Sequence, residues 1–391
     1  DKRYKDLDRI CFLSKNLYNV ALYTIKQEFL NTGKWIRAVD LNKKMVAENN
    51  IDYRAMSGSS SQQILMALDK NLKSYFSAIK AWKRDNKKFT GCPKFPKYKH
   101  KTKGRNVFSY SYAQFKHRGD FIYFPKKEGL SPLRTNCKEG TVKQVRFVPK
   151  SDCYVIEVVY ESIVKKQLDD NNRIMSIDLG VNNLASIVTN VSNKPILIDG
   201  RRLKSINQYY NKKRSDIQQQ LKKVNGKENS RRLMSLTRRR NNKVKDYLHK
   251  ASKEIINTCL KEDITTLIVG HNDGWKQNVS LGKRNNQNFV SIPFEMLISM
   301  LRYKSERQGL RFVEINESHT SKCSSFDLEP VCHHDTYVGR RVRRGLFKTR
   351  DGILINADIN GSYNIMRKVK GDAAMPPHTG FGYNPVKKFI N

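Results

Sequence analysis

Hydrophobic residues recur every three or four positions through most of the first hundred residues, which is the period of an amphipathic helix. Three helices are predicted in this way, over residues 7–30, 38–49 and 62–85. The third follows a serine-rich stretch whose hydroxyls suit a helix N-terminus. We therefore expect residues 1–104 to form a helical domain.

Beyond residue 104 the pattern changes to an alternation of hydrophobic and polar positions, which is the period of a half-buried strand. Short strands are predicted at 121–124, 142–148 and 154–160. We expect residues 105–168 to form a small β-barrel or sandwich, with a linker over 167–172.

Residues 169–391 combine short apolar runs with long amphipathic stretches. Two β-branched runs around 174–179 and 184–188 predict a hairpin. The other predicted elements are a turn at 199–202, strands at 195–198, 265–270 and 310–315, a helix at 291–308, and a helical hairpin over 205–260. Three strands, a helical insert, a strand, a helix and a strand, in that order, suit an RNase H-like α/β sheet.

Two acids stand where these elements end or begin. Asp178 closes the first strand of the hairpin, and Asp358 starts a late helix. A carboxylate buried at a strand end is costly unless it is paired or holds a cation. Each acid is therefore either a structural acid or a ligand of a divalent cation. The presence of both favours the cation, because two-metal phosphodiester chemistry needs a cage of carboxylates.

Lysine and arginine number 75 against 36 acids, for a net charge of +39. So large an excess indicates a polyanionic partner that is bound with salt-sensitive affinity. The 18 tyrosines and 17 phenylalanines are interleaved with the basic residues. This mixture favours nucleic acid over a membrane surface, because rings can stack on bases.

Apolar run length, the N-terminal sequence and the cysteines bear on the cellular compartment. No apolar run reaches the roughly 18 residues of a membrane span, and no signal peptide is recognisable. Seven cysteines show no framework spacing. We expect a soluble intracellular protein with reduced thiols.

Two segments concentrate the positive charge. Residues 87–99 alternate basic residues with rings and prolines, and the nucleic-acid contacts predicted there are Lys94, Lys97, Tyr98 and Lys99. Between 201 and 250 there are 17 lysines and arginines against three acids, and the phosphate contacts predicted there are Arg231, Arg232, Arg238, Arg239 and Arg240. The alternative for both segments is a merely solvated charged surface.

Three stretches together resemble one known family. They are Ile177–Leu184 around Asp178, His249–Ser252, and Asn356–Ser362 around Asp358. They look like the RuvC nuclease domain of the transposon-encoded TnpB family, and Lys94–Lys99 is similar to that family's recognition region. The resemblance extends over nearly the whole chain. Members of this family are RNA-guided DNA endonucleases, related to type V CRISPR effectors and to eukaryotic Fanzor proteins.

The resemblance implies a helical recognition domain over 1–104, a wedge-like β-barrel over 105–168 and a RuvC-like nuclease domain over 169–391. It further implies one protein per guide RNA, the RNA coming from a transposon end, and a short motif recognised beside the target. Cleavage of double-stranded DNA would use two Mg²⁺ ions. The compartment would be the cytoplasm or nucleoid of a bacterium, or the nucleus for a eukaryotic relative.

The middle acid departs from the usual family pattern. The strand at 265–270 ends in Gly270, where the family has a catalytic glutamate. Glu317 ends the neighbouring strand and can reach the same ion, and a subset of TnpB and Fanzor proteins is similar in having this rearranged glutamate. We therefore assign the metal ligands and catalytic acids to Asp178, Glu317 and Asp358, with Glu314 and Asp273 as rivals of Glu317.

The family's paired Cys-x-x-Cys zinc motifs are also incomplete here. The insert at 318–350, which resembles the family's target-strand-loading insert, offers only Cys323, Cys332, His333 and His334. Closed zinc sites usually build on two tight ligand pairs. We expect no zinc, and an insert that folds as a basic, metal-free loop.

Two other functions stay open. Gly270 in the expected acid position favours a guide-dependent DNA-binding protein without cleavage, comparable to a repressor. An Asp-x-Gly after a strand also occurs in ATPases of the actin and sugar-kinase type. That class needs a second glycine-rich phosphate loop, and the charge of +39 disfavours it.

Overall fold

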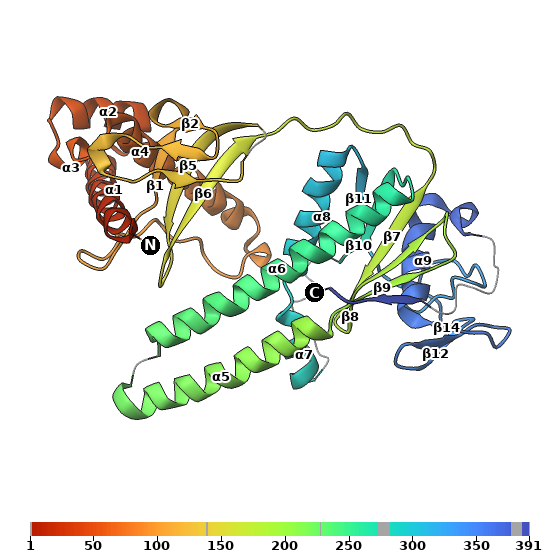
Figure 1. The fold of residues 1–391 in the computed structure, drawn as a ribbon. Helices are drawn as coiled ribbons and strands as arrows, with labels where there is room; N and C mark the ends of the chain where they lie inside the picture. Colours follow the sequence, from red (N-terminus) through yellow and green to blue (C-terminus); the bar gives the residue numbers. More distant parts are fainter. Residues whose placement is uncertain (1, 138–139, 227, 273–281, 377–384, 391) are drawn as a thin grey trace. The chain divides into compact units, whose positions relative to one another are not determined.

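Each half of the chain has its own hydrophobic core. In the computed structural model the chain divides into two units, residues 1–163 and 164–391 (Figure 1). The structure describes residues 2–137, 140–226, 228–272, 282–376 and 385–390.

Helices make up the first part of the first unit. They are α1 (Tyr4–Thr32), α2 (Ala38–Ala47), α3 (Ile51–Arg54) and α4 (Gly58–Arg84), followed by the 3-10 turn η1 (Asn86–Lys88). The helices predicted at 7–30, 38–49 and 62–85 correspond to α1, α2 and α4. The short α3 was not predicted from the sequence. Asn50 is its N-cap, and the Asn50 side chain accepts a hydrogen bond from the Tyr53 N–H.

Two small antiparallel sheets follow in the same unit. One has the order β1 (Phe108–Ser111), β5 (Thr141–Pro149), β6 (Tyr154–Glu161). The other has the order β2 (Lys116–Arg118), β3 (Phe121–Tyr123), β4 (Leu133–Arg134), and the turns η2 (Tyr112–Gln114) and η3 (Lys126–Glu128) connect strands. In the described part of the chain the strands thus form two separate sheets in place of the predicted β-barrel.

The helices and the small sheets share one core. Leu17 and Leu68 from the helices are buried together with Tyr110 and Phe147 from the strands. The segments that the sequence analysis divided at residue 104 therefore fold as one unit, because neither buries its apolar face without the other.

A six-stranded sheet is the centre of the second unit. Its strands are β7 (Ile174–Leu179), β8 (Asn183–Thr189), β9 (Ile196–Asp199), β10 (Thr266–Gly270), β11 (Arg311–Ile315) and β15 (Val386–Lys388), in the spatial order β11-β10-β7-β8-β9-β15. β8 is antiparallel to β7 and to β9, whereas β10 and β11 run parallel to β7. All the predicted strands of this half are present, and β15 is an additional edge strand.

Helices cover both faces of this sheet. They are α5 (Arg201–Asn225), α6 (Arg231–Lys261), α7 (Lys283–Val290), α8 (Phe294–Gln308), α9 (Ala357–Lys370) and the turn η4 (Asp372–Ala374). α6 and α8 contribute to the core on one face, and α9 to the core on the other. α5 and α6 form the predicted long hairpin, which extends beyond the sheet (Figure 1), although α5 already begins within the predicted turn at 199–202.

The insert between β11 and α9 contains a small antiparallel sheet of its own. Its strands are β12 (Arg340–Arg343), β13 (Leu346–Lys348) and β14 (Leu354–Asn356), paired in that order. The predicted basic loop is therefore wrong in its secondary structure, because the arginine-rich run forms a β-hairpin strand. In the described residues, no helix has both the length and the apolar character needed to cross a membrane.

Candidate active site

Asp178 lies on the face of β7 that is covered by α9. Met175, Ile177 and Leu179 belong to the core on the α6 side, so the alternating positions point to α9. Ser176 donates a hydrogen bond to the Ser362 carbonyl oxygen of α9 at 2.7 Å. A Cβ atom at Gly361 would lie 2.7 Å from Oδ2 of Asp178. Glycine at 361 therefore allows the carboxylate to approach the helix backbone closely.

Asp358 is placed by the N-terminus of α9. Asn356 caps the helix, and its side chain accepts hydrogen bonds from the backbone N–H groups of Asp358 and Ile359. One carboxylate oxygen of Asp358, Oδ2, accepts from Asn183 Nδ2 at 2.8 Å. The other, Oδ1, accepts from Arg341 Nη2 at 3.2 Å. Both partners were missed from the sequence, although Asn183 belongs to the stretch that carried the family resemblance.

Glu317 fills the space that Gly270 leaves at the end of β10. Gly270 pairs with Ile315 on β11, and Glu317 follows two residues later. A Cβ atom at Gly270 would lie 3.1 Å from Oε2 of Glu317 and 2.4 Å from Cδ1 of Ile365. On its other side β10 pairs with β7, where Val269 lies opposite Ile177. Gly270 therefore lies at the level of Asp178. The absence of a side chain at Gly270 thus makes room for the Glu317 carboxylate.

Asn272 holds Glu317 by two contacts. Its Oδ1 accepts from the Glu317 backbone N–H at 3.1 Å, and its Nδ2 donates to Glu317 Oε1 at 3.4 Å. Oε2 of Glu317 is buried and has no hydrogen-bond partner in the part of the chain that the structure describes. A buried carboxylate oxygen without a donor is costly, and a cation or a proton would satisfy it.

The pKa of Asp178 responds to both of the other carboxyl groups. Burial raises the pKa of Asp178 well above its ordinary value, and the negative charges of Glu317 and Asp358 raise it further. Arg341 acts in the opposite direction on that pKa. Burial also raises the pKa of Glu317 to about 7, while His271 and Lys368 lower it. A carboxyl group whose pKa is raised by two neighbouring carboxylates is typical of acids gathered for a cation.

The donor chemistry of this cluster fits a hard divalent cation, which takes carboxylate oxygens. In the observed conformation, however, no three His, Cys, Asp or Glu side chains of the described residues are grouped closely enough to enclose an ion. The contacts of Asp358 account for this arrangement, because Arg341 and Asn183 each engage one of its oxygens. Metal binding by Asp178, Glu317 and Asp358 therefore stays a prediction, supported by the unpartnered Oε2 of Glu317.

The two rivals of Glu317 fall elsewhere. Glu314 forms an ion pair with Arg302, and its Oε1 lies 3.2 Å from Nδ1 of His271. It is therefore already paired, on the side of β11 that faces α8. Asp273 lies outside the described residues.

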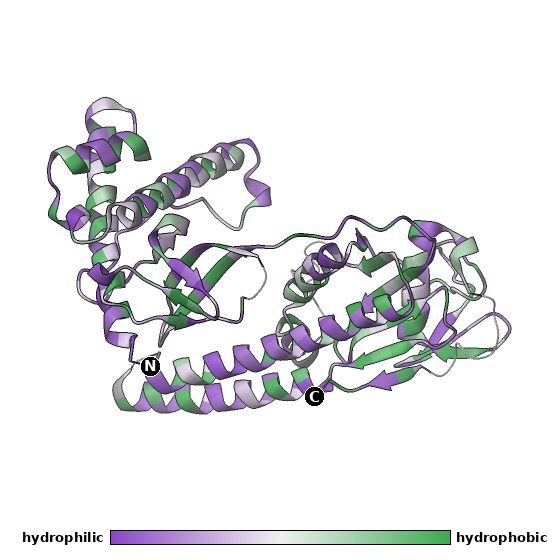
Figure 2. Cartoon of the chain, turned by 45° about the horizontal axis from the view of Figure 1, so that its top comes forward, coloured by the Kyte–Doolittle hydropathy of each residue, from purple (hydrophilic) through white to green (hydrophobic). Residues whose placement is uncertain are grey.

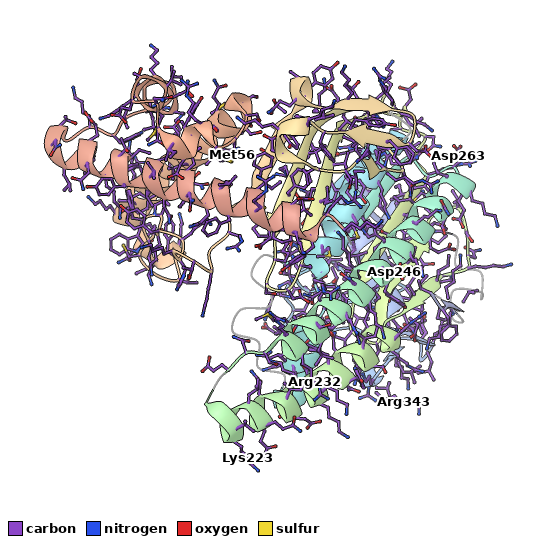
Figure 3. All side chains as sticks on the ribbon, turned by 60° about the vertical axis from the view of Figure 1, so that its left-hand side comes forward. Met56, Lys223, Arg232, Asp246, Asp263 and Arg343 are labelled. Carbon is purple, nitrogen blue, oxygen red and sulfur yellow. The ribbon has the colours of Figure 1, made fainter. Side chains whose placement is uncertain are left out.

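The basic residues of the α5–α6 hairpin differ in their surroundings. Hydrophilic residues run along both helices (Figure 2), and Lys223 and Arg232 lie toward the end of the hairpin that is far from the sheet (Figure 3). The predicted phosphate contacts that are exposed on α6 are Arg231, Arg232, Arg238 and Arg239. Their role stays a prediction.

Arg240 has a different environment. It donates to Asn207 at 2.7 Å, to Asn241 at 2.9 Å and to the Ser291 carbonyl at 2.7 Å. Burial lowers the pKa of its guanidinium. These bonds make Arg240 a structural link between α6, α5 and the end of α7, a role that was not predicted from the sequence.

The predicted contacts at 94–99 lie beside α1. Lys94, Lys97 and Tyr98 are exposed, whereas Lys99 is half-buried with its ammonium 5.0 Å from the Tyr18 ring. The segment therefore presents some of its charges to solvent and uses one for packing.

The side chains of the cysteines and histidines of the insert contact nearby residues of the insert. Cys323 Sγ lies 3.5 Å from the Cys332 carbonyl oxygen, and Cys332 Sγ lies 3.4 Å from His334 Nε2. The His333 ring packs edge-on against His319. The expectation that this insert binds no zinc stays a prediction.

Comparison with known proteins finds similar families and relatives. The family OrfB_IS605, described as a probable transposase, matches residues 157–276, and the Cas12f1-like TNB domain matches residues 294–365. TnpB-like protein ORF457 of Acidianus two-tailed virus is 23% identical over 402 residues, which cover 94% of this chain and 84% of its own. The chain is similar to TnpB-family proteins over nearly its whole length.

Further matches point the same way. TnpB-like protein MJ0751 of Methanocaldococcus jannaschii is 29% identical over 245 residues, covering 59% of this chain and 80% of its own. A Cas12f1 chain, solved by cryo-EM with sgRNA and target DNA, has a TM-score of 0.54 and 13% identity, covering 93% of this chain and 81% of its own. This likeness shows a Cas12-like α/β fold. The OrfB_IS605 match contains Asp178, and the TNB match contains Glu317 and Asp358.

Proposed function

We propose that this chain is an RNA-guided endonuclease that cleaves double-stranded DNA with a RuvC-like, RNase H-like domain. One observation carries the proposal. Asp178 on β7, Glu317 just after β11 and Asp358 on α9 lie in three separate parts of the chain, and the charges of the other two both raise the pKa of Asp178. Similarity to a family of transposon-associated nucleases supports it further.

Each carboxylate has a distinct part in the proposed site. Partly buried Asp178 and Glu317 would supply oxygens with little competing water, and Asp358 would supply a partly exposed oxygen once Arg341 leaves it. Bound Mg²⁺ would lower the pKa of a water molecule and neutralise charge on the scissile phosphate. Arg341 is then free to contact a backbone phosphate, because guanidinium groups bind phosphate as well as carboxylate.

The partners of this chain are proposed to be a guide RNA from a transposon end and a double-stranded DNA target. The net charge of +39 supports a polyanionic partner, and the Cas12f1 relative was solved with sgRNA and target DNA. Base pairing would read most of the target sequence, while the protein would read a short adjacent motif. One protein copy per guide RNA is proposed.

We also propose that the chain belongs to the subset with a rearranged glutamate, close to Fanzor proteins. The packing of Glu317 into the space beside Gly270 supports this assignment. The compartment would then be the nucleus in a eukaryotic host, or the cytoplasm or nucleoid in a bacterium.

Plasmid cleavage by the purified ribonucleoprotein tests the nuclease function. Asp178→Ala and Asp358→Ala should abolish cleavage in Mg²⁺ while RNA binding persists. Asp216→Ala is the control, because it removes an acid from the exposed surface of α5, far along the chain from the cluster. Unchanged cutting by either cluster variant would overturn the assignment.

A second candidate is a guide-dependent DNA-binding protein without cleavage. The bond between Arg341 and Asp358 favours it, because that bond occupies an oxygen that the metal would need. Target binding without cutting in Mg²⁺ or Mn²⁺ would support this function over the first.

A further inference from the structure

An apolar pocket opens on the first unit between α1, α4 and the segment after η1. Its volume is about 310 Å³, which is at the small end of ligand pockets, roughly 300–1,000 Å³. The residues that matter here are Lys26, Phe29, Trp35, Leu72, Phe76 and Phe95. Four of these six side chains are aromatic, so the walls offer flat rings.

The rings of the pocket are mutually arranged. The indole of Trp35 stacks on Phe76 with ring centroids 4.4 Å apart and an interplanar angle of 8°. Phe95 meets Tyr75 edge-on at 5.2 Å, and Tyr75 meets Phe76 edge-on at 5.1 Å. The rim remains accessible, because Phe29 is 43% exposed and Leu30 is 75% exposed. The pocket is thus a packed aromatic wall with an open edge.

The segment that carries Phe95 and Tyr98 is tied to α1 by its main chain. Asn19 exchanges two hydrogen bonds of 2.9 Å with the backbone of Lys99. Lys15 donates to the Lys101 carbonyl at 2.6 Å. These bonds hold the rings in place before any ligand arrives, which reduces the entropy that binding must overcome.

The charge around the pocket is positive. The Lys26 ammonium lies 5.3 Å from the Phe95 ring and 4.5 Å from the Tyr98 ring. Lys94 and Lys97 are exposed on the same segment. The acids nearby are already paired, Glu28 with Lys44 and Asp69 with both Arg37 and Lys73. An occupant with an aromatic face and a negative charge is therefore favoured.

We propose that this pocket binds an unpaired nucleobase of single-stranded RNA, with the base against Trp35, Phe76 and Phe95 and its flanking phosphates beside Lys26. The inference rests on the proposed function for the presence of RNA. It adds a base-binding site to the backbone contacts predicted at 94–99.

The chemistry of the pocket selects an unpaired base over other occupants. Bases in a duplex have both faces stacked, so they cannot enter an aromatic pocket without unpairing. An apolar protein segment would fill the cavity, but it would not use the surrounding lysines. Single-stranded RNA matches both features, because rings stack on its bases and lysines neutralise its phosphates.

Binding of short RNAs to the full chain tests the pocket. The probes are a labelled oligoadenylate and an abasic oligoribose phosphate of the same length, which has the phosphates without the bases. Trp35→Ala should weaken binding of the oligoadenylate roughly fivefold to a hundredfold, the range expected for loss of one stacked base. It should leave the abasic probe and the salt dependence unchanged, because no phosphate contact is lost.

Two further variants control for folding and for general aromatic contacts. Phe29→Ala removes a partly exposed rim ring and should weaken oligoadenylate binding in a chain that keeps its fold. Tyr112→Ala is the matched control, because this ring is 62% exposed and also has a lysine, Lys143, 6.0 Å from its centroid, but it lies outside the pocket. Tyr112→Ala should leave binding unchanged.

Trp35 also reports binding directly. The chain has three tryptophans, so replacing Trp82 and Trp275 by phenylalanine leaves Trp35 as the single fluorophore. The oligoadenylate should quench its emission and the abasic probe should not. Equal quenching by both probes, or equal affinity losses for both in Trp35→Ala, would overturn the proposal.

The result is separable from the nuclease proposal. If the wild-type chain binds RNA and cuts DNA while the pocket variants bind both probes normally, the pocket inference fails alone. If the wild-type chain binds no RNA at all, the proposed function fails with it.

Discussion

Arg341 on β12 donates a hydrogen bond to Oδ1 of Asp358 at 3.2 Å. The guanidinium also lowers the raised pKa of Asp178. The Arg341 guanidinium thus lies among carboxylates that are proposed to bind Mg²⁺. The guanidinium and the metal ion would compete for Oδ1 of Asp358.

Arg341→Gln should tighten Mn²⁺ binding by the chain without nucleic acid. A charge at hydrogen-bond distance in a partly exposed site is worth about 1 kcal/mol, so we expect an increase of roughly fivefold. Isothermal titration with Mn²⁺ measures it. Arg343→Gln is the control, because it removes the same charge from the same strand (Figure 3), whereas within the described part of the chain the hydrogen bond to Asp358 comes from Arg341. An equal effect of both variants would show that only long-range charge matters.

Glu317→Gln should stabilise the metal-free protein at alkaline pH. The pKa of Glu317 is raised from 4.5 to about 7, so its folded state binds a proton more tightly than its unfolded state. The wild type therefore loses stability as pH rises from 4.5 through 7, by at most about 3 kcal/mol. Neutral glutamine avoids this loss. The thermal midpoint in a chelator at pH 8 should be higher in the variant and nearly equal to the wild type at pH 5.

Glu314→Gln should have the opposite effect on the thermal midpoint at pH 8. Glu314 is paired with Arg302 and lies beside His271, so its loss should lower the thermal midpoint at pH 8. A Glu317→Gln protein less stable than the wild type at that pH would contradict the assigned burial of Glu317.

Asn272→Ala should reduce cleavage about tenfold to a hundredfold, which is the usual effect of removing a partner that orients a metal ligand. Asn272 makes both contacts that hold Glu317. Initial rates at saturating target and the Mg²⁺ concentration for half-maximal rate should both change. Asn316→Ala is the matched control, because Asn316 adjoins Glu317 but its amide oxygen accepts from the Ser318 N–H. If the two variants behave alike, Asn272 does not position Glu317.

Gly361→Ala should lower cleavage by at least tenfold. The new Cβ would lie 2.7 Å from Oδ2 of Asp178, so the carboxylate must move. Alanine favours a helix over glycine by about 1 kcal/mol, which offsets part of the overlap and keeps the thermal midpoint near that of the wild type. Gly58→Ala in α4, where a Cβ meets no atom within 4 Å, should leave cleavage unchanged.

Arg240→Ala and Arg239→Ala should separate folding from RNA binding. Arg240 donates to Asn207 and to the Ser291 carbonyl, so its loss should destabilise the second unit by roughly 1–3 kcal/mol. Arg239 is exposed, and its loss should weaken RNA binding and reduce the salt slope by about one. Thermal unfolding and binding at several salt concentrations measure the two effects. The reverse pattern would contradict the roles assigned from their contacts.

The sequence predicted the elements well where they depend on local patterning. The helical period of α1, α4, α5 and α6 and the β-branched runs of β7, β8 and β10 are visible within short windows, because each element buries one face. The predictions of a β-barrel and of a basic loop were wrong because both concern short strands. Short strands carry little pattern, so neither the separation of the two small sheets nor the pairing of β12 could be predicted locally.

By itself, the sequence determined that Asp178 ends a buried strand, that Asp358 begins a helix, and that the charge of +39 calls for a polyanion. Only the tertiary structure decided that Glu317 fills the space beside Gly270, that Arg341 reaches Asp358, and that Trp35 stacks on Phe76. These contacts join residues far apart in the chain. They depend on how α9, the insert and the sheet pack together, and no local pattern encodes the distance between two side chains on different elements.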